Sequence, residues 1–452
     1  MSSYYVQNFG CRAAQADGAA IEQQLRERGL KPAPVAGSAQ VVVLNTCTVT
    51  ASADKDVRAA IRRLQRENPD CKILVTGCYA QRAPQEVASI AGVNWVVGNS
   101  HKGKVGEIVC GTQELVSISG AGPAGGGRGT GSATAELFVG DIFAHTELLA
   151  APVFEAAHER TRPNLKVQDG CNNRCSFCII PSVRGRSRSL PLDAVLQQVN
   201  TLVAAGYREL VISGINLGQW GKDLDGFPQR RPFAALLRAV LELTALEKLR
   251  ISSVEPMDWT EELIELVAGS PRIARHAHVP MQSGSDRVLR RMHRRYRPWH
   301  YAAKIRRIRQ AMPTAAIGAD VMVGFPGETD DDFEQTRRMI EELPFTYLHV
   351  FTYSSRPGTP SAEMPEQVPP AVMKERNRIL RELAAEKKRA FLESFVGREL
   401  PAITLGAQKD GFTEALTDNY LPLWLRGEHQ ANRWIPAIVT AVSGDSLTGQ
   451  CR

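Results

Sequence analysis

The sequence contains no run of about 18 apolar residues, the length that a helix needs to cross a bilayer. Its amino terminus, MSSYYVQNFGCRAAQ, also lacks the basic stretch and following apolar stretch of a secretory signal peptide. These absences predict a soluble, cytoplasmic protein without a membrane partner. Because disulfides are rare in a reducing compartment, we interpret the nine cysteines as metal ligands or reactive groups.

The composition predicts a folded protein of several domains. A chain of 452 residues exceeds what one hydrophobic core usually organises, so two or three domains are expected. The hydrophobic fraction of 43% and the charged fraction of 23% are typical of globular chains. The net charge of +7 is moderate, so only its distribution along the chain can indicate an anionic partner.

The first hundred residues alternate short apolar runs with amphipathic stretches, for example VVVLN and then VRAAIRRLQREN. Strand and helix alternation of this kind predicts an α/β domain with a parallel sheet flanked by helices. The glycine-rich stretch GAGPAGGGRGTG (Gly120–Gly131) has the composition of a linker, so we place a domain boundary there.

After Lys166 the strand and helix rhythm resumes, which predicts a full or partial barrel with functional groups at the carboxyl ends of its strands. The candidate strands are Leu210–Ile212, Leu249–Ser252, His276–Pro280, Ala319–Val323 and Tyr347–Phe351. A polar helix is expected from Pro370 to Phe395. The last fifty residues contain short apolar runs separated by turns and predict a small all-β barrel.

One group of cysteines is compact: QDGCNNRCSFCIIPSVRG contains Cys171, Cys175 and Cys178, separated by three and then two residues. Three thiolates on one loop suit an iron–sulfur cluster or zinc. Structural zinc usually has four ligands in two paired knuckles, and no second CxxC pair or nearby histidine follows here. A cluster of four irons with three cysteine ligands keeps one iron open to chelate S-adenosylmethionine. We therefore favour the cluster and keep a structural zinc loop as the alternative.

The other group is dispersed, but Cys11, Cys47 and Cys78 each follow a predicted strand, in YYVQNFGC, VVVLNTC and KILVTGC. The carboxyl ends of neighbouring parallel strands lie along one edge of a sheet, so the three thiols are expected to converge. Burial as small apolar side chains explains one such cysteine better than three. A second cluster on these thiols would again have an open iron, able to carry an exogenous sulfur atom. No function is assigned to Cys71, Cys110 or Cys451.

The segment CNNRCSFC after a predicted strand resembles the signature of the radical-SAM superfamily. The resemblance implies a pocket for S-adenosylmethionine at the ends of barrel strands, where SGINLG, ISSVEP and VPMQSGSD stand. SGINLG resembles the glycine-bearing turn that contacts the methionine part of the cofactor. The cofactor-binding residues predicted in this way are Phe177, Ser213, Gly214, Ser253, Glu255 and Gln282.

Cys11, Cys47 and Cys78 ahead of such a core resemble the arrangement in the methylthiotransferase family, over nearly the whole chain. The resemblance implies a flavodoxin-like domain at residues 1–112, a linker at 113–160, a radical-SAM partial barrel at 161–392 and a TRAM domain that helps to hold RNA at 393–452. It also implies two 4Fe–4S clusters, with no catalytic residue beyond their ligands. The implied ligands are Cys11, Cys47 and Cys78 for one cluster and Cys171, Cys175 and Cys178 for the other.

The residues around the first two cysteines, FGCRAAQADG and NTCTVTASADKDVR, look like the MtaB branch of this family, which acts on N6-threonylcarbamoyladenosine beside the anticodon of tRNA. The implied reaction uses one S-adenosylmethionine to methylate a sulfur at the auxiliary cluster. A second is cleaved to a 5′-deoxyadenosyl radical that abstracts hydrogen from carbon 2 of the adenine, which then takes the methylthio group. The implied partners are the tRNA anticodon loop, a reductant such as flavodoxin or ferredoxin, and a sulfur donor.

Other functions stay open at this point. Within the family the substrate could be isopentenyladenosine in tRNA or a ribosomal protein. A different class is a non-catalytic iron–sulfur protein for electron transfer or RNA binding. The strand ends carrying Ser253, Glu255 and Gln282 argue against that class, because an electron carrier needs no small-molecule pocket.

Two basic stretches are candidates for contact with an anionic partner. Arg287–Tyr301 contains six arginines, two histidines and the aromatics Tyr296, Trp299 and Tyr301, which suit the phosphates and unstacked bases of a single-stranded loop. The alternative is a solvated helical face. The same two interpretations apply to Arg184, Arg186 and Arg188.

Overall fold

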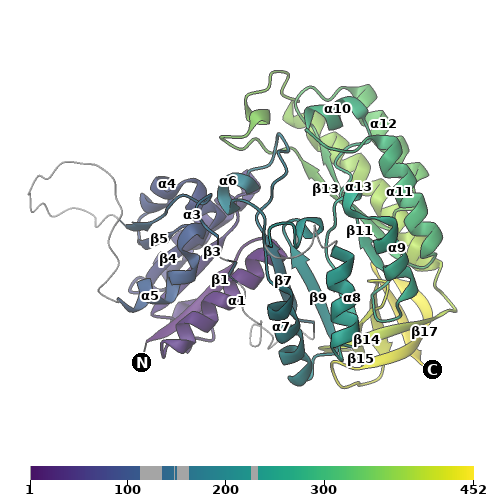
Figure 1. Ribbon diagram of the computed structural model, residues 1–452, viewed down its shortest axis with the longest axis horizontal. Coiled ribbons are helices and arrows are strands. Elements are labelled where there is room, and N and C mark those ends of the chain that lie inside the picture. Colours follow the sequence, from purple (N-terminus) through teal and green to yellow (C-terminus); the bar gives the residue numbers. More distant parts are fainter. Residues whose placement is uncertain (1, 112–134, 147, 150–161, 225–232) are drawn as a thin grey trace, which may run out of the picture. The chain divides into compact units, whose positions relative to one another are not determined.

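The computed structural model describes residues 2–111, 135–146, 148–149, 162–224 and 233–452 (Figure 1). They belong to two compact units, each considered by itself. The first comprises Met1–Ala151, Gly170–Asn172 and Ile179–Arg186, and the second comprises Pro152–Asp169, Asn173–Cys178 and Ser187–Arg452. The glycine-rich stretch at 120–131 lies outside the described residues. Among the described helices, none has the length and apolarity of a membrane span.

The first unit contains a six-stranded sheet in the order β2-β1-β3-β4-β5-β6. Every pairing in it is parallel, which confirms the predicted parallel α/β fold. The strands are β1 (Ser3–Asn8), β2 (Lys31–Pro32), β3 (Val41–Thr46), β4 (Lys72–Gly77), β5 (Val93–Val97) and β6 (Glu136–Phe138).

The central strand β3 is buried along its whole length because helices cover both faces of the sheet. Val42 and Leu44 pack with apolar residues of α2 in one core, and Val41 and Val43 pack with residues of α1 and α5 in another. Figure 1 shows these strands flanked by helices. The helices of the unit are α1 (Arg12–Glu27), α2 (Ala51–Glu67), α3 (Cys78–Arg82), α4 (Pro84–Ala88), α5 (Val105–Cys110) and α6 (Ile180–Arg184).

The second unit contains the predicted partial barrel. Parallel pairing runs from β7 to β9 to β10 and, separately, from β11 to β12 to β13. Two isolated parallel bridges, Leu249↔Ile273 and Ser253↔His278, connect the two sheets. All five predicted strands are present, with their ends shifted by a few residues. The strands are β7 (Asn164–Asp169), β8 (Arg188–Ser189), β9 (Glu209–Gly214), β10 (Lys248–Ile251), β11 (His276–His278), β12 (Ala316–Val323) and β13 (Tyr347–Thr352).

The helices of this unit begin at recognisable signals in the sequence. At α12, Thr329 and Asp332 form a capping box that satisfies two backbone N–H groups. The predicted polar helix is confirmed as α13, which starts with a proline in its first turn. The helices are α7 (Leu192–Ala204), α8 (Phe233–Leu243), α9 (Glu261–Gly269), α10 (Asp286–Arg291), α11 (Pro298–Ala311), α12 (Asp330–Glu342) and α13 (Pro370–Glu393).

The carboxyl-terminal part of the second unit is a closed five-stranded barrel, drawn in yellow in Figure 1. Its interior is filled by alternate apolar residues such as Leu423, Leu425 and Leu447. The prediction of a small all-β barrel is therefore confirmed. The strands are β14 (Glu399–Lys409), β15 (Phe412–Thr417), β16 (Pro422–Arg426), β17 (Trp434–Ser443) and β18 (Ser446–Cys451).

Candidate active site

The fold of the first unit gathers the dispersed cysteines at one edge of its sheet. Cys11 follows β1 at the start of α1, Cys47 follows β3, and Cys78 follows β4 as the first residue of α3. These three strands are neighbours in the sheet, so their carboxyl ends lie side by side. A Cβ atom placed on Gly10 would come within 2.7 Å of the Cys47 Cβ, which shows how closely the loop after β1 approaches Cys47.

The environment of these sulfurs suits a bound cation. The backbone N–H of Val49 donates to Cys47 Sγ over 3.5 Å, and the Asn99 side-chain amide donates to Cys78 Sγ over 3.6 Å. Burial, together with the neighbouring charges of Cys78 and Cys11, raises the pKa of the Cys47 thiol to about 11. Three thiolates at this place would repel one another because their charges have the same sign. Thiols that bind a metal are deprotonated, and the positive charge of the metal offsets this repulsion. The site therefore fits an iron cluster.

A buried group of charges lies within electrostatic reach of these cysteines. Asp17 accepts from Lys102 Nζ over 2.8 Å and from an Arg184 guanidinium nitrogen over 3.0 Å. All three side chains are almost fully buried, so two cations share one carboxylate. Burial lowers the pKa of Lys102, and the Asp17 and Cys78 charges oppose that effect.

This group corrects one interpretation of the sequence. Arg184 neither faces solvent nor is available to guide a substrate, because it is 2% exposed and ion-paired with Asp17. Arg188 is also buried, and only Arg186 of the three is exposed. The physical reason is that α6 packs into the apolar cluster of Cys78, Ile179 and Val183.

The compact cysteines lie on the loop that joins β7 to α6. Within the second unit this loop is held by backbone bonds: Ser176 N donates to the Met292 carbonyl over 3.1 Å, and Ser361 N donates to the Ser176 carbonyl over 2.9 Å. The N–H of Cys178 donates to the carbonyl of Cys175 over 3.1 Å. These hydrogen bonds hold the backbone of the loop in a tight turn between Cys175 and Cys178.

Arg294 connects this loop to the end of a barrel strand. One of its guanidinium nitrogens donates to Cys175 Sγ over 3.3 Å, and another pairs with the Glu255 carboxylate. Burial raises the pKa of Glu255, and the charge of Arg294 opposes that increase. The loop thus places the Cys175 thiol beside a buried cation. A hydrogen bond to the sulfur of a cluster ligand changes the reduction potential of the cluster.

The sequence matches two families. It matches the Radical SAM superfamily over residues 165–340 and the family described as Uncharacterized protein family UPF0004 over residues 3–98. A threonylcarbamoyladenosine tRNA methylthiotransferase MtaB of Bacillus subtilis is 37% identical over 94% of this chain and 91% of its own length. This chain belongs to the radical-SAM methylthiotransferase family. It is a radical-SAM tRNA methylthiotransferase, and its cofactors are S-adenosylmethionine and 4Fe–4S clusters.

Other relatives of this methylthiotransferase bear a different substrate in their names. A tRNA-2-methylthio-N(6)-dimethylallyladenosine synthase of Thermobifida fusca is 34% identical over 89% of this chain and 77% of its own length. Among solved structures, the radical S-adenosylmethionine methyltransferase TsrM of Kitasatospora setae shares the fold at a TM-score of 0.56 and 15% identity. That match covers 80% of this chain and 77% of that one.

The predicted cofactor-binding residues of this methylthiotransferase lie at strand ends of the second unit or on the cysteine loop. Ser213 and Gly214 end β9, Ser253 and Glu255 follow β10, Gln282 follows β11, and Phe177 precedes Cys178.

Two observations fit a bound cofactor at these strand ends. The Ser213 hydroxyl is buried and makes no hydrogen bond to any described residue. Gln282 adopts a φ of 63°, a left-handed conformation that costs energy for a side chain of this kind. The assignment of these six residues to S-adenosylmethionine stays a prediction.

The basic stretch at 287–301 is mostly structural in this methylthiotransferase. Tyr296 and Tyr301 are buried and cannot stack on a base. Five of its six arginines pair with carboxylates, which leaves Arg295 without an ion pair to a described residue. Trp299 is 57% exposed. Of the three aromatic residues in this stretch, only Trp299 is exposed enough to stack on a base.

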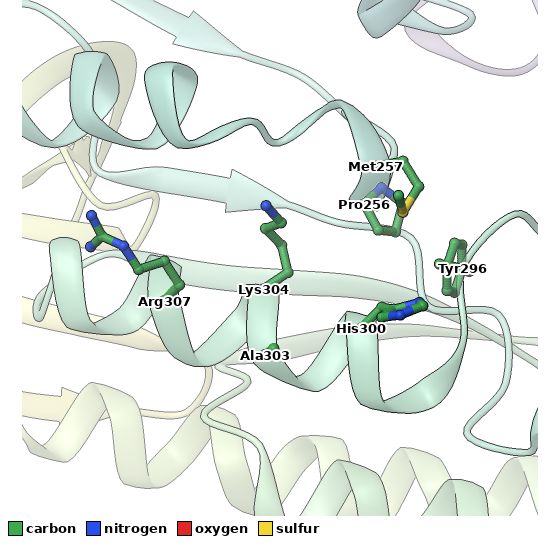
Figure 2. Close-up of a pocket in the computed structure, with 7 residues that line it drawn as sticks. All are labelled: Pro256, Met257, Tyr296, His300, Ala303, Lys304 and Arg307. Atoms are coloured by element: carbon green, nitrogen blue, oxygen red, sulfur yellow. The ribbon is translucent and has the colours of Figure 1, made fainter.

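A shallow pocket lies beside this stretch. Figure 2 shows His300, Lys304 and Arg307 of α11 extending from one side of the helix, with Tyr296 beyond its amino-terminal end. Pro256 and Met257 line the pocket from the loop after β10. Basic side chains on α11 therefore continue from the exposed His300 past the predicted stretch to the half-buried Lys304 and Arg307, and Arg307 pairs with Glu261.

Sequence reasoning missed several polar residues of the two sites. Arg294 was one arginine in a charged run, and nothing in the sequence distinguished it as the partner of Cys175. Asn99 meets Cys78 across 21 positions of sequence, and Lys102 meets Asp17 across 85 positions. The polar character of Asp17 and Lys102 in positions of helical burial was the only available signal.

Proposed function

We propose that the chain methylthiolates carbon 2 of N6-threonylcarbamoyladenosine next to the anticodon of tRNA. The observation that carries this proposal is the similarity to MtaB enzymes of four bacteria, at 32–37% identity over 88–96% of the chain. Methylthiolation of isopentenyladenosine is the second candidate, because relatives named dimethylallyladenosine synthases are 34–37% identical over 83–99% of the chain.

Each group of cysteines has its own role in this proposal. Cys171, Cys175 and Cys178 hold one cluster, and Cys11, Cys47 and Cys78 hold the other. When bound, the cofactors supply the radical and the methylthio group, and the protein supplies their position and their electrostatic surroundings. Arg294 donates to Cys175 Sγ and places a buried positive charge beside that ligand.

The residues at the barrel strand ends bind and orient S-adenosylmethionine. The Ser213 hydroxyl and the half-buried Ser253 offer hydrogen bonds, and Glu255 offers a carboxylate whose orientation Arg294 fixes. Gly214 allows the Gln168 side chain to approach the end of β9, because a Cβ at this position would meet that side chain at 2.9 Å. Phe177 and Gln282 complete the set of six. A low-potential reductant such as flavodoxin or ferredoxin and a sulfur donor belong to this proposal.

The substrate base must leave its stack to expose carbon 2, so the proposed substrate is a single-stranded anticodon loop. The closed carboxyl-terminal barrel has the architecture of small nucleic-acid-binding modules and is proposed to help hold the tRNA.

Mass spectrometry of tRNA nucleosides tests the proposal directly. Nucleosides are compared between cells that contain the protein, cells that lack it, and cells that carry a Cys175→Ser variant. Selective loss of methylthiolated threonylcarbamoyladenosine in the last two is expected. Loss of the methylthiolated isopentenyl nucleoside instead would identify the second candidate, and an unchanged nucleoside pool would contradict both.

A further inference from the structure

One face of the sheet formed by β12 and β13 is open and polar. In the parallel register Asp320 lies opposite His349, and Met322 lies opposite Phe351. The alternate residues of β12, Ala319, Val321 and Val323, are buried on the other face. By contrast, the His349 side chain is 57% exposed and Phe351 is 44% exposed. The edge strand β13 therefore presents an imidazole ring and an aromatic ring side by side on this face.

Two histidines share the Asp320 carboxylate on this face. His278 Nε2 lies 3.1 Å and His349 Nδ1 lies 3.2 Å from Asp320 Oδ1. His278 is held from its other side, because its Nδ1 is 3.0 Å from the Tyr347 hydroxyl. Burial acts to raise the pKa of Asp320, but the hydrogen bonds from the two histidines outweigh it and hold the pKa well below its usual range.

This geometry orients His349 for contact with a ligand. Because Nδ1 faces a carboxylate, which only accepts, Nδ1 carries the proton. The other ring nitrogen, Nε2, makes no hydrogen bond to any described residue and belongs to an exposed side chain. A ring that donates from Nε2 as well as from Nδ1 is an imidazolium, whose charge would lie between the Asp320 carboxylate and an anionic ligand.

The open face is electrostatically coupled to the cysteine loop of the same unit. The charge of Asp320 contributes to the raised pKa of Glu255, which pairs with Arg294. Arg294 in turn donates to Cys175 Sγ. A ligand on His349 would therefore lie within range of the same groups that surround the proposed radical site.

We propose that His349, oriented by Asp320, is a specificity-determining residue that donates a hydrogen bond to the carboxylate of the threonylcarbamoyl group. This inference rests on the proposed function. The threonylcarbamoyl group carries a carboxylate, a hydroxyl and a urea, whereas the isopentenyl group is entirely hydrocarbon. Covering His349 with hydrocarbon would leave its Nε2 unpaired, and such a site discriminates strongly. The exposed ring of Phe351 offers a surface for the adenine.

The test uses the holoenzyme with both clusters and two anticodon stem–loop RNAs that differ only in carrying threonylcarbamoyladenosine or isopentenyladenosine. His349→Leu removes the donor from an exposed position, and Glu375→Leu, at a 56% exposed position on α13, is the control. In His349→Leu we expect KM for the threonylcarbamoyl RNA to rise about 10- to 100-fold, the value of one hydrogen bond to a charged group. Formation of 5′-deoxyadenosine without RNA should be unchanged in Glu375→Leu. Asp320→Asn should shift KM in the same direction by less, because His349 keeps its ring nitrogens and loses only the charge of its partner.

The outcomes separate the inference from the function on which it rests. If the wild type modifies the threonylcarbamoyl RNA and His349→Leu does so with the same KM, the inference is wrong and the proposed function stands. If the wild type modifies only the isopentenyl RNA, both are wrong. The ligand atoms of His278, Asp320 and His349 lie within 4.8 Å of one another, which also suits a divalent metal. One equivalent of zinc, beyond the iron of the clusters, that is present in the wild type and absent in His349→Leu would overturn direct recognition.

Discussion

The two groups of cysteines are positioned by different parts of the fold. Cys171, Cys175 and Cys178 lie on one loop, so their proximity is set by local chain geometry. Cys11, Cys47 and Cys78 lie after three separate strands, so their proximity exists only when the parallel sheet has formed. The comparison teaches that a local group of ligands can be recognised from its spacing in the sequence, whereas a dispersed group depends on the integrity of its whole unit.

The largest effect is expected from the compact group. Cys175→Ser removes a proposed ligand that also receives the Arg294 hydrogen bond, and a serine hydroxyl is a poor ligand for iron. We expect 5′-deoxyadenosine formation to fall below detection when the reduced protein is incubated with S-adenosylmethionine. A variant that still cleaved the cofactor would remove Cys175 from the site.

A substitution in the dispersed group should abolish methylthiolation without abolishing cleavage of S-adenosylmethionine. In Cys78→Ser we expect methylthiolated product to be lost while 5′-deoxyadenosine formation persists, because the compact group is intact. Bound iron should fall from about eight to about four atoms per chain, measured by colorimetric iron analysis. Loss of cofactor cleavage together with product would show that the two sites do not operate separately.

The dispersed group should also be sensitive to backbone shape, without any change in a ligand. Gly10 has a φ of 113°, and an added Cβ would lie 2.7 Å from the Cys47 Cβ. Gly10→Ala is therefore expected to displace Cys47 and to lower the iron content by up to about four atoms. Gly29→Ala is the control, since it has a similar φ of 81° but open space around the Cβ position. Equal iron content in the two variants would contradict the steric explanation.

The smallest effect concerns the stability of the first unit. Asp17→Asn leaves Lys102 and Arg184 buried without their shared anion, which should cost about 3–5 kcal/mol. A lower urea midpoint for the loss of first-unit structure is the expected readout. Glu375→Ala on α13 breaks an ion pair between exposed side chains and should leave the midpoint unchanged. The same midpoint in both variants would show that the buried charges contribute nothing to stability.

Much of the fold could be predicted from local pattern. Runs such as VVVLN are apolar at every position, and the alternation with amphipathic stretches indicated a parallel sheet covered on both faces. From there, the placement of three cysteines after three strands followed from the geometry of parallel sheets.

The polar surroundings of the sites could not be predicted, because they depend on contacts between distant residues. Arg184 meets Asp17 across 167 positions of sequence, and His349 meets Asp320 only through the register of β12 and β13. Tyr296 and Tyr301 were expected to face RNA, but they are buried because their hydroxyls donate to carbonyls at the end of β11 and in the loop after it. A stretch of charged residues does not show, from sequence alone, which of its residues make buried contacts within the fold.

Residues Ile179–Arg186 follow the compact cysteines directly in the chain, yet they belong to the first unit, where Asn99 binds the Val183 carbonyl over 2.7 Å. The first unit is therefore assembled from separated stretches of the chain. A gene fragment ending after residue 112 would omit Arg184, one of the two cations paired with Asp17, and the apolar cover of Cys78. Exchange of this unit between relatives would have to carry α6 along with the amino-terminal strands.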